Sequence, residues 1–428
     1  MKFIIKNARI IDKENKLIQV DFLLESGKIK AIGSDLSEIY GSVEKIYDAK
    51  NALVIPGLVD LHVHLREPGF EYKETIETGS LAAAHGGYTT ICAMPNLNPV
   101  PSKPDRVKAI YEKIKEHAKV KVLQYATITD ELRTGDLVDF EGLIKAGAFA
   151  FSNDGAAIQS ASTMYQAMLE AARLGKAIVA HVEEESLMNG GVMRLGKRSH
   201  ELGIPGMPSI VESSQLARDL VLAQATGVHY HVCHVSTKES LRLIRDAKKA
   251  GVHVTAEVCP HHLILSDEDI IEDNAIWKMN PPLPSKSDRA ALVEGLLDGT
   301  IDLISTDHAP HSKAEKEGSF VEGSFGIVGS ETAFSLIYTE FVKKGIFTLE
   351  QVVRWMSLNP ASLFNLKVGN LQIGSPADLA VFDIDNDYEI DARDFESKGT
   401  NSPFIGWKVK GKTLMTFVEG KLVWYEKE

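Results

Sequence analysis

Short apolar runs alternate with amphipathic stretches through the middle of the chain. Eight runs rich in strand-forming residues recur between residues 58 and 307: "LVDLHVH", "YTTICAM", "VKVLQYATI", "AFAFSND", "AIVAHVE", "HYHVCHV", "VHVTAEV" and "IDLISTD". Apolar positions at helical spacing lie between them, in residues 103–118, 162–174, 211–225, 238–250 and 287–297. Alternating strands and helices predict parallel βαβ units, and eight units predict an α/β fold of the (β/α)₈ TIM-type barrel class. A doubly wound open sheet is the alternative, but no G-x-G-x-x-G follows the first strand.

The two ends of the chain have a different pattern. Alternating runs such as "FIIKNARIID" and "TLMTFVEGKLVWYEKE" predict strands, and Glu419–Gly420 predicts a hairpin turn. Neither end is large enough for a good core of its own, so we expect the two ends to pair into one small β-sandwich domain. The predicted organisation is therefore residues 1–55 and 365–428 for the β domain and residues 56–364 for the barrel.

Net charge, apolar runs and cysteine count argue against several classes of protein. The net charge of −12 argues against a general nucleic-acid or anionic-membrane binder, since those proteins concentrate Lys and Arg. No apolar run approaches the roughly 18 to 20 residues that span a bilayer, and the apolar patch in "MKFIIKNARIID" is too short for a signal peptide. Three cysteines do not make a disulfide framework, so we expect a cytoplasmic protein.

The first strand of the predicted barrel, within "PGLVDLHVH", carries ionisable groups on one face. Asp60, His62 and His64 share one parity, so their side chains project to the same side of an otherwise apolar strand.

Histidine and aspartate residues also lie at the ends of other predicted strands. Six side chains that can bind a metal fall at the carboxyl ends of five strands: His62, His64, Asp154, His181, His234 and Asp307. In a barrel those ends converge on one mouth, where such enzymes place their chemistry. Imidazole and carboxylate ligands suit Zn²⁺ and similar ions. The sequence therefore predicts a metal centre.

The remaining histidines are interpreted as structural residues. His229 and His231 are expected to face outward. His261 and His262 could approach the mouth, but two adjacent residues cannot both face inward on a strand.

Six protein ligands exceed what one catalytic zinc ion uses. Two ions roughly 3.5–4 Å apart would use all six if one carboxylate bridges them. We assign His62, His64 and Asp307 to one ion, His181 and His234 to the other, and Asp154 to both. A hydroxide between the ions would complete the site, its pKa lowered by their charge.

Several motifs extend this pattern: "HLREPG" (64–69), "MPNLNPV" (94–100), "FSNDG" (151–155), "MNPPL" (279–283) and "STDHAPH" (305–311). Together with "PGLVDLHVH" they resemble the amidohydrolase superfamily and, within it, the bacterial type I dihydroorotases, over essentially the whole chain. The resemblance implies two Zn²⁺ ions per subunit and interconversion of N-carbamoyl-L-aspartate and L-dihydroorotate in pyrimidine biosynthesis. Many relatives, hydantoinases included, bridge their metals with a carboxylated lysine at strand four. Lys145 precedes that strand in a predicted helix, so Asp154 is expected to bridge directly.

The resemblance also implies substrate contacts. Arg66, Asn96 and His311 match the family's contacts to the substrate carboxylate, next to His64, and a guanidinium suits bidentate carboxylate recognition. Asn280 and the Phe325–Gly326 backbone match the contacts to the pyrimidine ring. For Arg66 the alternative is a surface ion pair with Glu67 or Glu71. Residues 311–326 are expected to form a mobile segment near the mouth, with 313–316 as an ordinary solvated loop.

The implied mechanism uses Asp307 as general acid and base. In ring opening the bridging hydroxide attacks the amide carbonyl, and Asp307 carries its proton to the leaving nitrogen. In cyclisation Asp307 removes a proton from the ureido nitrogen.

Two alternative functions are compatible with the same sequence. Another cyclic amidohydrolase, such as a hydantoinase or allantoinase, is the nearer one, although Arg66 with Asn96 favours a substrate that carries a carboxylate. A non-catalytic scaffold is the other, although such a protein is expected to have lost ligands. A homodimer and an association with aspartate carbamoyltransferase are expected partners.

Overall fold

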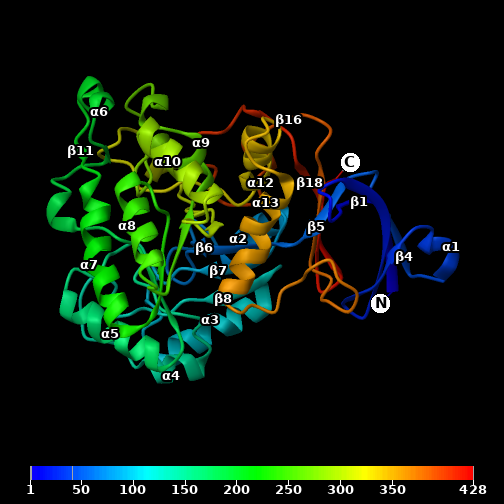
Figure 1. Cartoon of the computed structure of the whole chain (residues 1–428), viewed down its shortest axis with the longest axis horizontal. Coiled ribbons are helices and arrows are strands. Elements are labelled where there is room, and N and C mark those ends of the chain that lie inside the picture. Colours follow the sequence, from blue (N-terminus) through cyan, green and yellow to red (C-terminus); the bar gives the residue numbers. More distant parts are fainter. Residues whose placement is uncertain (1, 41, 428) are drawn as a thin grey trace.

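The computed structural model describes residues 2–40 and 42–427, which form an α/β part and a sheet domain (Figure 1). The α/β part contains parallel strands surrounded by helices, and the sheet domain contains both termini. No helix in these residues is long and apolar enough to span a membrane.

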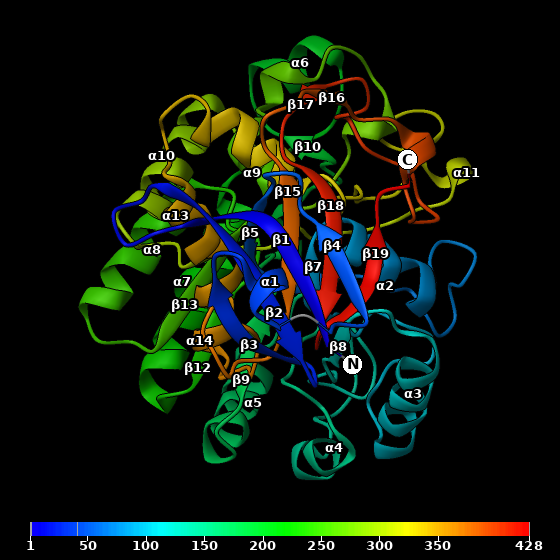
Figure 2. The ribbon, with the colours of Figure 1, turned by 90° about the vertical axis from the view of Figure 1, so that its right-hand side faces the viewer.

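The sheet domain combines strands from the two ends of the chain, as predicted. The strand order is β19-β18-β15-β5-β1-β2-β3, with β4 paired to β1. Figure 2 shows the blue strands of the N-terminal end and the red strands β18 and β19 of the C-terminal end within this one domain. The strands span Lys2–Ile11 (β1), Leu17–Glu25 (β2), Lys28–Gly33 (β3), Lys45–Asp48 (β4), Leu53–Pro56 (β5), Leu379–Asp383 (β15), Lys412–Val418 (β18) and Lys421–Tyr425 (β19).

Alternate residues of these strands form a separate apolar core. Phe3 and Ile5 of β1, Phe22 of β2, Leu379 of β15 and Phe417 of β18 belong to one buried cluster. Since side chains alternate along a strand, the shared cluster means that one face of the sheet curls around its own core.

The predicted hairpin is confirmed at the C-terminal end. β18 and β19 pair antiparallel with Val418 opposite Lys421. The two residues between them, Glu419 and Gly420, have φ values of 47° and 72°. Positive φ at both positions is what a tight turn needs to match the twist of its flanking strands.

Seven of the eight predicted central runs are parallel strands. They span Leu58–Val63 (β6), Tyr88–Ala93 (β7), Lys121–Gln124 (β8), Ala177–Ala180 (β9), His229–Val232 (β12), Val254–Val258 (β13) and Leu303–Ile304 (β14). They form two sheets, β6-β7-β8 and β9-β12-β13-β14.

The fourth run, "AFAFSND", has no extended strand, which departs from the prediction. Phe151 makes isolated parallel bridges to Ala126, beyond β8, and to Ile178 of β9. Another parallel bridge joins Val63 to His308, beyond β14. These bridges connect the two sheets at both edges.

The five predicted helices are confirmed, with boundaries within two residues. They are Pro104–His117 (α3), Ala161–Arg173 (α5), Ile210–Thr226 (α7), Lys238–Lys249 (α8) and Lys286–Leu297 (α10). The other helices are Leu36–Tyr40 (α1), Ile76–His85 (α2), Phe140–Ala146 (α4), Lys197–Leu202 (α6), Pro260–Ile264 (α9), Lys313–Lys316 (α11), Ala333–Ile337 (α12), Leu349–Val353 (α13) and Asn359–Leu363 (α14).

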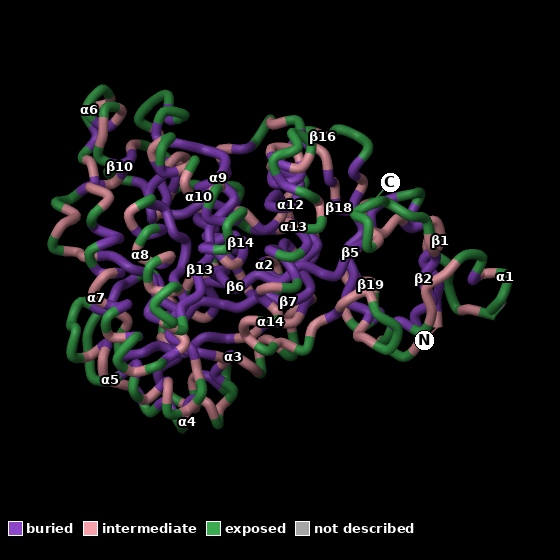
Figure 3. Tube along the Cα trace, viewed as in Figure 1, coloured by how far each residue is buried: buried purple, intermediate pink, exposed green. Residues whose placement is uncertain are grey.

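Two short two-stranded pairs lie outside the three larger sheets. Met193–Arg194 (β10) pairs with Gly206–Met207 (β11), and Tyr388–Glu389 (β16) pairs with Lys408–Val409 (β17). The central strands β6, β13 and β14 lie in the buried interior, while the outer surfaces of α5, α7 and α8 are partly exposed (Figure 3). The α/β core therefore encloses the strand ends that carry the predicted site.

Candidate active site

The six predicted ligands come together at the carboxyl ends of the parallel strands. His62 is the next-to-last residue of β6 and His64 directly follows that strand, while His181 follows β9, His234 follows β12 and Asp307 follows β14. Asp154 follows the bridged residue Phe151. All six side chains are buried.

The chain reaches these positions through unusual backbone conformations. Arg66, His234 and Asp307 have φ values of 61°, 32° and 51°. Residues other than glycine rarely adopt positive φ, and such positions gather at functional sites where the surrounding fold imposes them.

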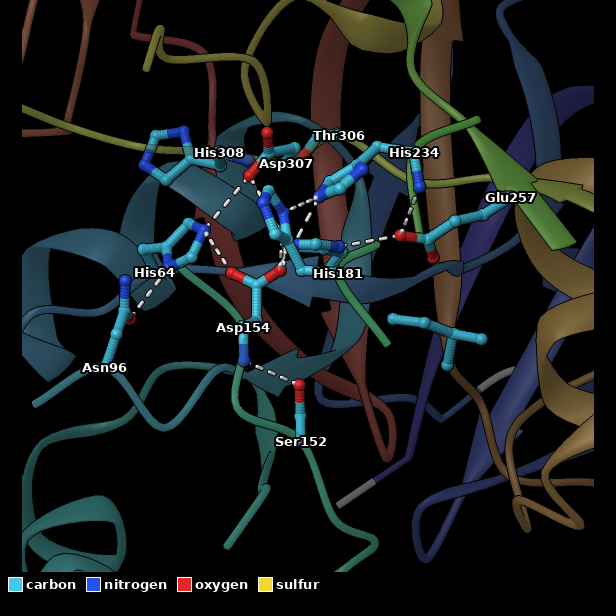
Figure 4. A network of polar contacts seen from close by, with 12 residues as sticks. His64, Asn96, Ser152, Asp154, His181, His234, Glu257, Thr306, Asp307 and His308 are labelled. Carbon is cyan, nitrogen blue, oxygen red and sulfur yellow. Dashed lines mark hydrogen bonds and ion pairs between the residues drawn. The ribbon is translucent and has the colours of Figure 1, made fainter. Parts of the chain in front are cut away.

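Asp154 lies at the centre of the group (Figure 4). Its Oδ1 is 3.3 Å from His62 Nε2, 3.5 Å from His234 Nε2 and 3.8 Å from His181 Nδ1. Its other oxygen, Oδ2, is 3.5 Å from His64 Nε2. One carboxylate thus faces four imidazoles, which is the placement expected of a bridging ligand.

Asp307 completes the first half of the centre. Its Oδ1 is 3.0 Å from His64 Nε2 and 3.4 Å from His62 Nε2. The donor atoms of His62, His64 and Asp307 form one group that could hold a metal ion, and those of Asp154, His181 and His234 form a second. The sequence assigned these residues to the same two ions, with Asp154 bridging both, and the structure also brings the donor atoms of His62 and Asp154 together with that of Cys233.

The donor atoms fit a small tetrahedral cation. Two atoms bound to one such ion at roughly 2.0–2.1 Å lie about 3.3 Å apart, close to the separations found here. His62 Nε2 and Asp154 Oδ1 are buried and face each other, yet neither makes a hydrogen bond. Buried polar atoms are normally satisfied, and a cation between these two atoms would satisfy both.

The electrostatics of the centre follow from this packing. Burial disfavours a charged His62, but Asp154 and Asp307 outweigh burial and raise its pKa well above the ordinary value. Burial likewise opposes the Asp154 carboxylate, but His62 and His234 hold its pKa well below the usual range. The negative Asp pair therefore favours positive charge at this point, which a cation would supply.

A buried carboxylate that sequence reasoning missed orients His62. Glu257 of β13 accepts from His62 Nδ1 at 2.6 Å through Oε1 and lies 3.1 Å from His231 Nε2 through Oε2. The bond at Nδ1 leaves His62 Nε2 turned toward Asp154 and Asp307. The expectation that His231 faces outward is wrong, because its side chain is fully buried against Glu257. The sequence offered one signal for the role of Glu257, which is its position as a charged residue in the otherwise uncharged run of β13.

Asp60 shares the face of His62 but has another role. It accepts from the backbone N–H of His62 and from the N–H and hydroxyl of Thr306. Burial raises the pKa of Asp60 to about 6, although the bonds from Thr306 and His62 act in the opposite direction. Asp60 fixes β6 against the end of β14.

A further group of donor atoms lies next to the centre. Those of Cys259, His261 and His262 lie within 4.8 Å of one another. His261 and His262 were expected to lie on a strand, where adjacent residues point to opposite sides, but residues 260–264 form helix α9 and both imidazoles are buried.

The predicted substrate residues line one cavity of about 570 Å³ beside the centre. Its lining includes His64, Arg66, Asn96, Asn280, His311, Phe325 and Gly326, together with Asp154, His181, His234 and Asp307.

Arg66 is a buried cation in this cavity. The alternative of a surface ion pair is wrong: Glu67 pairs with Lys113, and Glu71 accepts from the backbone of Gly69. Arg66 Nε donates to Pro310 O at 3.3 Å, and no carboxylate in the described chain forms an ion pair with its guanidinium. A buried, unpaired guanidinium favours an anionic ligand.

Two amides of the cavity are held by protein groups. Asn96 Oδ1 accepts from His64 Nδ1 at 2.8 Å, which turns His64 Nε2 toward Asp307. Asn280 Nδ2 donates to Glu183 Oε2 at 2.6 Å. Sequence reasoning missed Glu183, which follows His181 by two residues and also lines the cavity.

The loop that carries Phe325 and Gly326 is tied down at several atoms. His311 Nε2 donates to Phe325 O at 2.7 Å, and Gly326 N donates to Lys278 O at 3.0 Å. Burial and the charge of Arg66 lower the pKa of His311 to about 3, so its imidazole is neutral near pH 7. A carbonyl oxygen has two lone pairs, so Phe325 O can accept a second hydrogen bond from a ligand.

Residues 313–316 were expected to form an ordinary solvated loop, but they form the short helix α11, which is exposed at Lys313 and buried at Lys316. The side chain of Lys313 is 91% exposed. Lys316 is buried and donates to Lys278 O, Ser324 O and Gly326 O at 2.8–2.9 Å. It was missed because a lysine in a charged stretch gives no sign of being enclosed.

No lysine replaces Asp154 at the centre. Lys145 lies in α4, is 73% exposed and pairs with Glu141 at 2.7 Å. This agrees with the sequence interpretation that Lys145 belongs to a helix away from the strand end.

Comparisons with protein-family models and with known proteins both find dihydroorotases. The family model described as Dihydro-orotase-like matches residues 51–240. A dihydroorotase from Enterococcus faecalis is 62% identical over 426 residues, covering 100% of this chain and 99% of the relative. A dihydroorotase from Staphylococcus aureus is 55% identical, covering 98% of each.

Solved structures share the fold. An L-hydantoinase (dihydropyrimidinase) from Arthrobacter aurescens is similar with a TM-score of 0.89 and 29% identity, covering 100% of this chain and 96% of that one. A D-hydantoinase (dihydropyrimidinase) from Thermus sp. gives 0.84 and 26%, covering 100% and 97%. With relatives above 50% identity over the full length and both ligand sets present, the chain belongs to the dihydroorotase family of the amidohydrolases.

Proposed function

We propose that this protein is a metal-dependent dihydroorotase that interconverts N-carbamoyl-L-aspartate and L-dihydroorotate in pyrimidine biosynthesis. The observation that carries the proposal is the placement of two metal-ligand groups at one end of a cavity that an unpaired buried guanidinium also lines. The full-length relatives named dihydroorotase support it. The same geometry argues against a scaffold, because a scaffold has no need of a complete ligand set.

The centre is proposed to hold two Zn²⁺ ions. His62, His64 and Asp307 would hold one, His181 and His234 the other, and Asp154 both. The imidazole and carboxylate donors suit zinc, and the orphaned His62 and Asp154 atoms support an ion at this point.

The cavity is proposed to orient the substrate by its carboxylate. Arg66 would bind that carboxylate, with Asn96, His311 and His64 around it. The ring would then lie toward Asn280 and the Phe325–Gly326 peptide, with its reacting amide beside Asp307.

Proton transfer is assigned to Asp307. When bound, the metal ions would polarise the amide carbonyl and lower the pKa of the attacking water. In ring opening Asp307 accepts a proton from that water and donates it to the leaving ring nitrogen. In cyclisation Asp307 accepts the proton of the ureido nitrogen. Because Oδ1 makes the contacts to His62 and His64, Oδ2 is the oxygen that we assign to this transfer.

The mechanism predicts that Asp307→Asn lowers kcat by about 10²-fold or more while metal content largely remains. An amide keeps an oxygen at the same place but cannot accept the proton. Steady-state kinetics and metal analysis of the purified variant test this. Near-normal turnover by the variant would refute the assignment.

We also infer the finer architecture. The parallel bridges at Phe151 and between Val63 and His308 support a closed (β/α)₈ barrel over residues 56–364. The curled core shared by β1, β2, β15 and β18 supports a small β-sandwich from residues 1–55 and 365–428. We further propose a homodimer, association with aspartate carbamoyltransferase and a cytoplasmic location, where the three free cysteines would stay reduced.

The substrate is tested by assaying dihydroorotate, hydantoin and allantoin side by side, with metal analysis of the same preparation. We expect turnover of dihydroorotate alone and about two zinc ions per chain. Turnover of hydantoin without dihydroorotate would overturn the proposed substrate, and full activity after metal removal would overturn the proposed metal centre.

A further inference from the structure

A buried amide from the C-terminal segment joins two loops of the candidate active site. Asn401 lies between β16 and β17, in the part of the chain that follows most of the sheet domain. It is 4% exposed, although asparagine is usually a surface residue. A buried amide must have its donors and acceptor satisfied, so its partners show what it does.

Asn401 bonds to both loops at once. Its Nδ2 donates to Ala309 O at 3.1 Å and to Gly326 O at 3.0 Å. Its Oδ1 accepts from His311 N at 3.0 Å, and its backbone O accepts from Val328 N at 3.0 Å. The first loop carries His311, and the second carries Phe325 and Gly326.

Only an amide satisfies these partners. Two of them are carbonyl oxygens, which need donors, and the third is a backbone N–H, which needs an acceptor. A carboxylate of the same shape could accept from His311 N but would place negative charge against the Ala309 and Gly326 carbonyls. Gly326 O also accepts from Lys316, whereas Ala309 O would lose its donor.

The segment is itself fixed to the α/β part. Ser397 Oγ donates to Glu74 at 2.5 Å, and Lys410 N donates to Thr339 Oγ1 at 2.8 Å. In Figure 1 this red-orange segment runs next to α12. Asn401 is thus held from outside the strand ends and can fix the spacing of the loops.

We propose that Asn401 is a positioning residue for substrate binding, which sets the distance between the carboxylate-binding His311 and the ring-binding Phe325–Gly326 peptide. The proposal rests on the proposed function for those two contacts. Asn401 is not among the metal ligands and does not itself line the cavity, but it bonds to the lining residues Ala309, His311 and Gly326. Its loss should therefore weaken substrate binding and leave the metal centre intact.

Asn401→Asp is the sharpest test, because it changes hydrogen bonding without changing shape. We expect KM for dihydroorotate to rise about 10-fold or more, since a buried carbonyl left without its donor costs on the order of a factor of ten in an equilibrium. We expect kcat to change far less and metal content to stay at the wild-type level. Asn386→Asp is the matched control, because Asn386 is exposed and bonds only to nearby Asp383.

Hydrogen–deuterium exchange gives a readout that does not depend on the substrate. Peptides that cover residues 309–328 should exchange faster in Asn401→Asp and remain unchanged in Asn386→Asp. Asn401→Ser, which keeps one small hydroxyl, replaces Asn401→Asp in these measurements if the Asp variant does not fold. We expect Asn401→Ser to raise KM and to speed exchange at residues 309–328 by smaller factors.

The outcomes separate the two proposals. Faster exchange at residues 309–328 together with a raised KM supports the positioning role. Wild-type KM and exchange in a folded Asn401 variant overturn it, and so does a loss of metal that accounts for the defect. If the wild-type enzyme does not turn over dihydroorotate, the proposed function fails instead, while exchange still shows whether Asn401 holds the loops.

Discussion

The Glu257→Gln substitution tests whether the candidate metal centre depends on a residue outside its ligand set. Glu257 is fully buried, 2.6 Å from His62 Nδ1 and 3.1 Å from His231 Nε2. Burial opposes its charge, but His62 and His231 hold its pKa below the usual range, so the carboxylate is ionised. Glutamine keeps the size and one acceptor oxygen and removes only the charge and the second acceptor.

The local structure can accommodate the glutamine. If its oxygen faces His62, its amide nitrogen faces His231 Nε2, which must then accept a hydrogen bond. His231 can do so by carrying its proton on Nδ1, where Thr255 Oγ1 lies at 2.8 Å. The fold should therefore survive, and the effect should concentrate at His62.

The magnitude follows from the lost charge. A hydrogen bond to an ionised acceptor is about twice as strong as a neutral one, so His62 loses basicity and orientation. Substitutions of such outer partners of metal-binding histidines typically cost 10- to 100-fold in metal affinity, or about 1.4–2.7 kcal/mol. Since glutamine keeps one bond to His62, we expect the lower end, about tenfold.

Competition between the protein and a zinc chelator measures this change directly. Glu331→Gln is the matched control, because the buried Glu331 carboxylate pairs with His85 away from the centre. We expect weaker metal binding in Glu257→Gln and wild-type binding in Glu331→Gln. Equal affinity in all three proteins, or an equal loss in both variants, would refute the reasoning.

Three further predictions follow from the cavity and its loops. Arg66→Lys should raise KM for dihydroorotate about 10-fold or more with little change in metal content, because an ammonium cannot replace a bidentate guanidinium; an unchanged KM would contradict the assignment. Gly326→Ala should lower kcat/KM more than tenfold, since Gly326 has φ +130° and an added Cβ would lie 2.6 Å from the Ala309 Cβ. The control is Gly345→Ala, where φ is +71° with open space around, and an equal loss there would count against the steric argument. Burial lowers the pKa of Lys316 from its ordinary value of 10.5 to about 7, so folding disfavours its charged form. Denaturant unfolding should therefore show wild type gaining stability relative to Lys316→Met as the pH rises from 7 toward 10, and a pH-independent difference would contradict this.

Local pattern in the sequence was enough to find most of the strands, the main helices and the candidate metal ligands that the structure brings together. The alternation of side chains along β6 placed His62 and His64 on one face, and the repeat of strand and helix placed the other ligands at neighbouring strand ends. These inferences need only the periodicity of regular elements and the convergence of parallel strand ends. The exception is the fourth run, which forms no extended strand. Phe151 pairs with each of its two neighbours through a single bridge.

The residues that hold the site together could not be found in this way. Glu257 and His62 are 195 residues apart, and Asn401 and His311 are 90 residues apart. A charged or amide side chain has the same local pattern whether it faces water or a buried partner. Its role depends on which distant atoms come to surround it, and no periodicity encodes that.

The sequence by itself determined which side chains converge at the strand ends, because chain geometry fixes the direction of each side chain within its own element. Only the tertiary structure decided which of the remaining polar groups are buried, which partners satisfy them, and therefore which imidazoles and loops are held in place. Desolvation and hydrogen bonding depend on neighbours in space, whereas periodicity depends on neighbours along the chain.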